Sequence, residues 1–137
     1  MAEKNLPKIN PIDRPFWQGA EEGKFLLQHC RACGKLQFFP RVVCTGCFSA
    51  DLDWTAARGE GEVHSFTRVF VPRNPAFKDE VPIYYANVRL DEGVIIESRI
   101  VGNGLEEIKL GDRVRVAFQE TSDPKIKLPV FELAGRL

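Results

Sequence analysis

Several features that mark common protein classes are missing from this sequence of 137 residues. It has no run of 18 or more apolar residues, which predicts that no helix spans a membrane. Its first eight residues lack the apolar core of a secretory signal peptide, which favours a cytoplasmic protein. The length fits one domain, or a small module attached to a larger protein.

An excess of positive charge is also missing. The chain has 19 basic and 19 acidic residues; residues 1–57 hold seven and six of them, leaving twelve and thirteen in residues 58–137. Nucleic-acid-binding proteins usually carry a basic excess, because neutralising phosphates supplies much of their affinity. The balance therefore argues against nucleic-acid binding, although a local basic patch is compatible with it.

Familiar catalytic motifs are absent too. The sequence contains no GxSxG motif, no Walker loop and no dinucleotide-binding glycine pattern. Of the two histidines, His29 abuts Cys30, and His64 lies in a predicted strand with no identifiable carboxylate to orient it as a general base. We therefore expect both histidines to be structural and the chain alone to lack catalytic activity.

The four cysteines are the strongest positive signal. They form two CxxC pairs, Cys30–Cys33 and Cys44–Cys47, with ten residues between the pairs. A CxxC turn brings two thiolates within about 4 Å of each other on one metal ion, so two turns complete a tetrahedral Cys₄ site. Such a site is closed and structural. Zinc is favoured over disulfides or free thiols, and cysteine spacing alone is also compatible with a rubredoxin-like iron centre.

The chain divides into three predicted segments. Residues 1–27 form an arm and a short helix, with Pro15 in the first helical turn and Gly23 at the C-terminal cap of a helical stretch in residues 14–27. The aromatic residues Phe16 and Trp17 must dock this short helix on something, either its own domain or a partner protein. Residues 28–50 form the ribbon, in which residues 36–43 are predicted to make a small hairpin over the metal.

Residues 58–137 are predicted to be a β domain. Five segments rich in β-branched and aromatic residues are separated by turn signals: residues 61–71, 82–90, 94–101, 112–118 and 128–134. Residues 105–111 fit one helical turn between the third and fourth strands. This order predicts a five-stranded OB-fold barrel in a mainly β protein, with an SH3-like barrel as the alternative.

The first strand of this domain and the loop after it carry candidate ligand contacts. Arg68 alternates with Phe66 and Phe70, a pattern that OB folds use to stack single-stranded bases, but the neutral charge balance argues against that use and favours packing. In the proline-rich loop of residues 72–82, Arg73 and Lys78 are cations that a phosphorylated ligand would attract, and solvated charges are the alternative.

The order of these parts resembles the acyl-CoA-associated zinc-ribbon/OB-fold family. The resemblance covers about residues 15–137 and rests on several short stretches taken together. They are FWQG at residues 16–19, CRACGK at 30–35, FPR at 39–41, CTGC at 44–47, PAF at 75–77, DEGV at 91–94, GDRVRV at 111–116 and LPVF at 128–131.

This resemblance implies a non-catalytic accessory subunit of a thiolase-type acyl-CoA enzyme complex. It implies that Cys30, Cys33, Cys44 and Cys47 bind a structural zinc ion, that Phe16 and Trp17 face the thiolase-fold partner in a hetero-oligomer, and that CoA or acyl-CoA is a shared ligand. The residues assigned to the CoA side are Arg68, Arg73, Phe77 and Lys78.

Two other functions stay open at this point. One is a single-stranded nucleic-acid-binding protein, since zinc ribbons and OB folds also occur in translation and transcription factors. The other is a stand-alone acyl-CoA enzyme such as a hydratase or thioesterase, which the missing general base disfavours. The acyl group and the stoichiometry of a complex leave no signal in the sequence.

Overall fold

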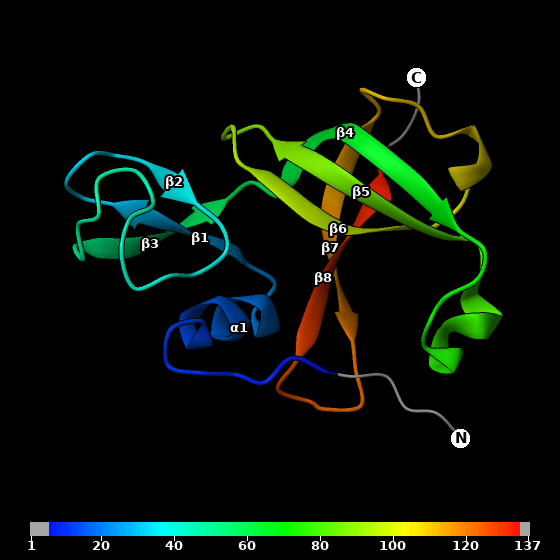
Figure 1. Ribbon diagram of the computed structural model, residues 1–137, viewed down its shortest axis with the longest axis horizontal. Coiled ribbons are helices and arrows are strands. Elements are labelled where there is room, and N and C mark those ends of the chain that lie inside the picture. The colour runs from blue at the N-terminus through cyan, green and yellow to red at the C-terminus, as the bar shows by residue number, and fades with distance from the viewer. Residues whose placement is uncertain (1–5, 135–137) are drawn as a thin grey trace.

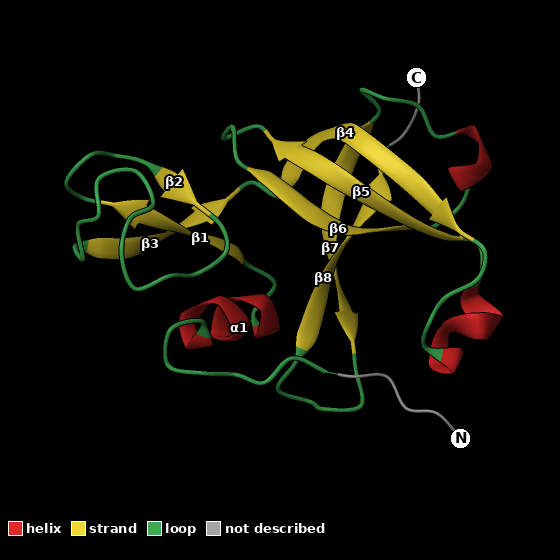
Figure 2. Ribbon diagram, viewed as in Figure 1, coloured by secondary structure: helices red, strands yellow, loops and turns green. Residues whose placement is uncertain are grey.

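A short helix, a three-stranded sheet and a closed five-stranded barrel make up the computed structural model, which describes residues 6–134 (Figures 1 and 2). The small sheet and the barrel lie side by side along the long axis, and the helix lies beneath the sheet, next to the barrel (Figure 1). Within the described residues, no helix has the length and apolar character needed to cross a membrane.

Helix α1 (Arg14–Glu21) has Pro15 in its first turn, as predicted. It ends before Gly23, which adopts a φ of 80°, a left-handed conformation that costs glycine nothing sterically. Residues 25–27, which the prediction included in the helical stretch, instead begin strand β1 (Phe25–Cys30). Phe25 and Leu27 are buried on one face of that strand, so strand alternation and not helical packing decides its conformation.

The ribbon is built on an antiparallel sheet with the order β2–β1–β3. Strand β2 (Leu36–Gln37) has only two residues and pairs with β1, while β3 (Leu52–Ala57) pairs with β1 along its whole length. The predicted hairpin at residues 36–43 is therefore wrong in detail. The hairpin joins β1 to β2 and encloses the first CxxC turn, and the second turn lies in a long loop between β2 and β3.

The barrel contains β4 (Glu60–Val69), β5 (Ile83–Leu90), β6 (Ile95–Val101), β7 (Arg113–Glu120) and β8 (Lys127–Leu133) in the order β4–β5–β6–β8–β7. The 3₁₀ helix η1 (Pro75–Glu80) lies in the loop after β4, and η2 (Leu105–Glu107) lies between the third and fourth barrel strands. This is the OB-fold arrangement, so the predicted fold is confirmed.

A bulge in β4 changes the predicted faces of that strand. The register with β5 shifts between Val63 and Ser65, so His64 is the extra residue. His64 is exposed, whereas Phe66 packs against the core. The sequence prediction placed both side chains on one face, and the bulge reverses the alternation that it assumed.

One apolar core runs through the helix, the ribbon and the barrel. In the barrel, Val88, Ile100, Val114 and Phe131 are almost completely buried. In the ribbon, Phe25 lies in the same cluster, with its ring centroid 6.4 Å from that of Phe131 in β8. The aromatic contact between β1 and β8 therefore joins the two parts of the molecule.

A glycine elbow connects β3 to β4. Gly59 has a φ of 75°, and its carbonyl oxygen accepts a hydrogen bond of 2.7 Å from the Val116 amide. A Cβ atom at this position would overlap the Val116 side chain, so both the backbone angle and the close approach require glycine. Nearby, Asp91 in the β5–β6 turn accepts two 2.9 Å hydrogen bonds from Arg113 and lies 3.4 Å from Arg58.

Candidate metal centre and ligand cleft

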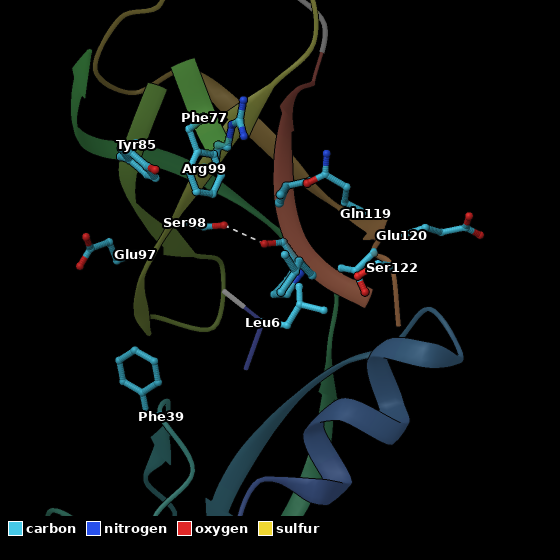
Figure 3. Close-up of a pocket in the computed structure, with 14 residues that line it drawn as sticks. Leu6, Phe39, Phe77, Tyr85, Glu97, Ser98, Arg99, Gln119, Glu120 and Ser122 are labelled. Carbon is cyan, nitrogen blue, oxygen red and sulfur yellow. Dashed lines mark hydrogen bonds between the residues drawn. The ribbon is translucent and has the colours of Figure 1, made fainter. Parts of the chain in front are cut away.

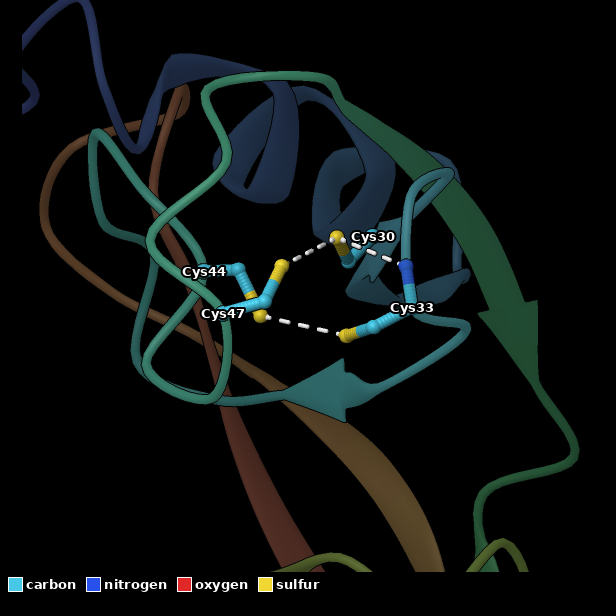
Figure 4. Close-up of side chains that lie close together, drawn as sticks. All are labelled: Cys30, Cys33, Cys44 and Cys47. Atoms are coloured by element: carbon cyan, nitrogen blue, oxygen red, sulfur yellow. Dashed lines mark hydrogen bonds between the residues drawn. The ribbon is translucent and has the colours of Figure 1, made fainter.

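The four cysteine thiols converge at one end of the ribbon (Figure 4). Their sulfur atoms all lie within 4.8 Å of one another, with 3.6 Å between Cys30 Sγ and Cys47 Sγ and 3.6 Å between Cys33 Sγ and Cys44 Sγ. None of the four forms a disulfide. Each close pair combines one thiol from each CxxC turn, so both turns contribute to a single cluster.

This geometry fits a tetrahedral thiolate site. Zinc–sulfur bonds of about 2.3 Å require sulfur–sulfur separations of about 3.8 Å, close to those of the two pairs. Backbone amides also point at the sulfurs: the Cys33 amide donates to Cys30 Sγ at 3.4 Å, and the Gly46 amide donates to Cys44 Sγ at 3.3 Å. The cluster can therefore hold one metal ion with four thiolates and no open coordination position.

The same backbone amides change the acidity of the thiols. Hydrogen bonds from the Cys47 amide, and then from the Gly46 amide, lower the pKa of Cys44 to about 6. The Cys33 amide likewise lowers the pKa of Cys30. A bond to the Lys35 backbone lowers the pKa of Cys33, but the Cys44 thiol and burial outweigh it and raise that pKa to about 11. Binding of a metal ion releases the protons that the cluster still holds.

Two buried glutamines hold the loop that carries the second CxxC turn. Gln37 Nε2 donates to Gln28 Oε1 at 2.8 Å, and Gln28 Oε1 also accepts from the Arg41 amide at 2.8 Å. The side-chain oxygen Gln37 Oε1 accepts from the Thr45 amide at 2.9 Å, one residue after Cys44. The sequence analysis missed these glutamines, because a polar residue in a short strand gives no local sign that it is buried.

A cleft of about 840 Å³ opens on one side of the barrel (Figure 3). It lies over β5, β6 and β8 and between the loops that carry η1 and residues 121–122, which is the face that OB folds commonly use for ligands. Its apolar lining includes Phe39 from the ribbon, Phe77 from η1, and Tyr85, Leu128, Pro129 and Val130 from the barrel.

The charges in the cleft are mainly acidic. Among residues 6–134, its lining contains Glu97, Glu120 and a single cation, Arg99. The Arg99 guanidinium donates to Glu80 Oε1 at 2.9 Å, and both side chains of this pair are largely buried. Arg99 is therefore already neutralised, and the other two charged side chains of the described lining, Glu97 and Glu120, are acidic.

The structure separates the four residues predicted to bind CoA. Only Phe77 lines the cleft. Arg73 and Lys78 are exposed, Lys78 in the last turn of η1 and Arg73 two residues before that helix. Arg68 lies on β4, where its guanidinium contacts the Tyr84 ring at 5.6 Å and donates to the Glu106 carbonyl at 3.3 Å.

Phe16, one of the two residues predicted to face a partner, is buried within this chain. It is 3% exposed, and its ring centroid lies 5.6 Å from that of Phe25 and 5.3 Å from that of Phe38. Trp17 is half-buried beside it, with ring centroids 5.0 Å apart. This packing favours the alternative in which the helix docks on its own domain.

Large apolar side chains are instead exposed on the ribbon. Phe39, Val42 and Phe48 are 61%, 69% and 77% exposed, and they flank the second CxxC turn in the sequence. We call these three residues the ribbon rim. Large apolar side chains that stay exposed are candidates for an interaction surface, and residue type alone did not distinguish them from the buried aromatics.

Comparisons with known proteins agree with both parts of the structure. The family model of the ChsH2 rubredoxin-like zinc ribbon domain matches residues 17–53, and that of the ChsH2 C-terminal OB-fold domain matches residues 54–119. A DUF35 domain-containing scaffold protein of Methanothermobacter thermautotrophicus is 32% identical over 95 residues, covering 69% of this chain and 71% of that protein. The chain belongs to the DUF35 family. The resemblance drawn from the sequence is thereby confirmed.

Two further relatives of this DUF35 protein carry more specific names. A probable enoyl-CoA hydratase alpha subunit of Thermomonospora curvata is 36% identical over 129 residues, 93% of this chain, and the chain spans only 39% of that protein. The solved structure named Ltp2-ChsH2(DUF35) aldolase contains a chain with 33% identity and a TM-score of 0.82. That alignment covers 95% of this chain and 100% of the other.

Proposed function

We propose that this DUF35 protein is a non-catalytic accessory subunit of a thiolase-type acyl-CoA enzyme, to which it adds a rigid interface and part of a CoA path. The observation that carries the proposal is the similarity along nearly the whole chain to the DUF35 chain of an aldolase whose name joins Ltp2 to ChsH2. A scaffold protein and an enzyme alpha subunit among the relatives also support an assembly role.

The positions of the reactive side chains support a non-catalytic role. Within residues 6–134, the cleft lining includes neither histidine nor cysteine. His29 pairs with Asp53 at 2.8 Å on the ribbon sheet, and His64 contacts Arg89 on the exposed side of the barrel. Glu97 and Glu120 are the candidate general bases in the described lining, and turnover by the purified chain alone would be needed to assign them that role.

We propose that the four cysteines hold a structural zinc ion. When bound, this ion supplies no open coordination position for a substrate, and its role is to fix the two CxxC turns against each other. The chain itself supplies the thiolates, the backbone amides that donate to them and the buried glutamines that position the second turn.

The CoA contact is assigned to the flank of η1. Arg73 and Lys78 would attract the phosphates of CoA from outside the cleft, while Phe77 offers an apolar surface at its edge. We expect Arg73→Ala combined with Lys78→Ala to weaken CoA binding by about tenfold, measured by calorimetry on the assembled complex. Lys109→Ala is the matched control, and equal losses in both variants would contradict the assignment.

Affinity purification of the tagged chain from its native cells tests the main proposal. We expect a thiolase-type enzyme to co-purify in a fixed ratio, and we expect the purified chain alone to turn over no acyl-CoA thioester. Recovery of the chain without such a partner, or turnover by the chain alone, would reject the accessory role.

The acidic cleft argues against the nucleic-acid alternative. Phe39, Phe77 and Tyr85 would offer stacking surfaces to bases, but the two carboxylates beside them repel a phosphate backbone. We expect no salt-dependent binding of single-stranded RNA or DNA, and a steep salt dependence at micromolar affinity would favour that alternative instead.

A further inference from the structure

The barrel is paired only briefly between β6 and β8. These two parallel strands pair at Ile100 with Phe131 and at Val101 with Glu132. Residues 95–99 of β6 pair with β5 alone. In an antiparallel pair, half of the backbone N–H and C=O groups of a strand point away from its neighbour. The first part of β6 therefore has a free strand edge, of which Glu97, Ser98 and Arg99 line the cleft, and the Ser98 side chain donates across to β8 (Figure 3).

The opposite edge, on β8, cannot accept a strand in the same way. Pro129 has no amide hydrogen, and its carbonyl oxygen already accepts a hydrogen bond of 3.0 Å from Ser98 Oγ. Proline commonly protects an exposed strand edge from pairing. Pro129 therefore interrupts the edge of β8, whereas residues 95–99 of β6 contain no proline.

The side chains around this free edge select for a particular ligand chemistry. Tyr85, Phe39 and Leu128 form apolar walls that can accept an aliphatic or aromatic side chain. Glu97 and Glu120 lie on opposite sides of the cleft and point outward (Figure 3). An anionic ligand would meet these carboxylates, whereas a segment with cationic side chains on either side of an apolar one would complement them.

We propose that the cleft binds an extended peptide segment of a partner protein, which adds to the free edge of β6 as an extra strand. Backbone hydrogen bonds to residues 95–99 supply affinity, and the apolar walls and carboxylates select a Lys or Arg residue on either side of an apolar residue. The inference rests on the proposed function in that the partner subunit would carry this segment, but peptide binding can be measured without that subunit.

The test selects a displayed library of random heptapeptides on the full chain. In parallel, the library is selected on the charge-reversed double variant Glu97→Lys with Glu120→Lys. We expect the wild-type chain to enrich extended sequences with Lys or Arg on both sides of an apolar residue. No enrichment on the wild-type chain, or the same sequences enriched on both chains, overturns the proposal.

The best enriched peptide is then synthesised with and without N-methylation of alternate backbone amides. We expect the unmodified peptide to shift the amide resonances of residues 95–99, and N-methylation to weaken its binding at least about tenfold. Glu97→Lys with Glu120→Lys should weaken it by about tenfold as well, because two favourable charge pairs become repulsive. Glu106→Lys, a charge reversal outside the cleft, should leave binding unchanged.

Shifts confined to residues outside the cleft, or equal binding of the N-methylated peptide, overturn strand addition. Thermal unfolding of the double variant shows whether it is folded. If it is unfolded, strand addition is judged from the comparison between unmodified and N-methylated peptides on the wild-type chain. Failure of these experiments leaves co-purification with a thiolase-type enzyme untouched. Peptide binding at the free edge of β6 without co-purification of such an enzyme would reject only the accessory role.

Discussion

The ribbon and the barrel are stabilised by different interactions, although they share one core. In the barrel, buried Val88, Ile100 and Val114 alternate with exposed residues, so removing apolar surface from water supplies most of the stability. In the ribbon, four thiols and two buried glutamines organise a long loop with few buried apolar side chains. The comparison suggests that the barrel tolerates loss of the metal better than the ribbon does.

The largest effect is expected from removing one thiol. Cys44→Ser should reduce bound zinc from about one equivalent per chain toward none, because the remaining three thiolates leave the site open. Metal analysis measures the loss, and amide spectra should show the ribbon resonances collapsing while the barrel resonances keep their dispersion. Thr55→Ser, an exposed change on β3, is the control. Simultaneous unfolding of both regions would contradict the proposed difference.

The second prediction concerns a buried side chain of the barrel and not the metal site of the ribbon. Ile100→Ala in β6 removes a side chain that is 1% exposed and should lower the free energy of unfolding by about 2–5 kcal/mol. Zinc content should stay unchanged. Ile95→Ala on the same strand, where the side chain is 46% exposed, should cost no more than about 0.5 kcal/mol. Denaturant unfolding compares the two variants, and a similar cost for both would show that burial is not the source of barrel stability.

A smaller effect is expected in the polar network of the ribbon. Gln37→Ala leaves the Thr45 amide without its acceptor and removes one of the two donors to Gln28 Oε1, and it should cost about 1–3 kcal/mol. It should also speed the transfer of zinc to a chelator, because the second CxxC turn is held less firmly. Gln18→Ala on the exposed face of α1 is the matched control. An unchanged rate of zinc transfer would show that the glutamine network does not stabilise the metal site.

The smallest effect concerns an ion pair of the barrel. Hydrogen bonds from Arg113 lower the pKa of Asp91 below its ordinary value of 3.8. The ionised carboxylate therefore stabilises the fold above about pH 4, and this contribution disappears as the pH falls through the lowered pKa. The melting temperature of Asp91→Asn should lie below that of the wild type at neutral pH and converge with it in acid. A difference between Asp91→Asn and the wild type that stays constant from neutral pH into acid would reject the linkage.

Local patterns in the sequence predicted the parts of the molecule that depend on local chemistry. The cysteine spacing indicated the thiol cluster, and five β-rich segments with a helical turn after the third indicated the OB fold. Phe16 was ambiguous, because an aromatic residue on a short helix suits a core or an interface equally well. The bulge at His64 could not be foreseen from alternation, since one inserted residue changes the faces of everything after it.

Apart from Phe77, the residues that line the cleft gave no signal in the sequence. Phe39, Tyr85, Glu97 and Leu128 come from distant parts of the chain, and the cleft lies beside the part of β6 that precedes its short pairing with β8. Arg99 would count as a free cation in the sequence, and only its contact with Glu80 shows that it is neutralised. Charge totals therefore indicated the overall balance correctly but gave no warning of a local acidic site.

The glycine elbow at Gly59 has a consequence for avidity. Because its backbone angle and its fit against Val116 allow no side chain, the elbow fixes the span between the ribbon rim and the cleft. A partner that contacts both surfaces meets the second at an effective concentration set by that span, which can reach about millimolar for a short connection. Two individually weak contacts can then hold a subunit tightly. Extra residues inserted beside Gly59 would lower this avidity, and they would also displace Phe39, which belongs to both the ribbon rim and the cleft lining.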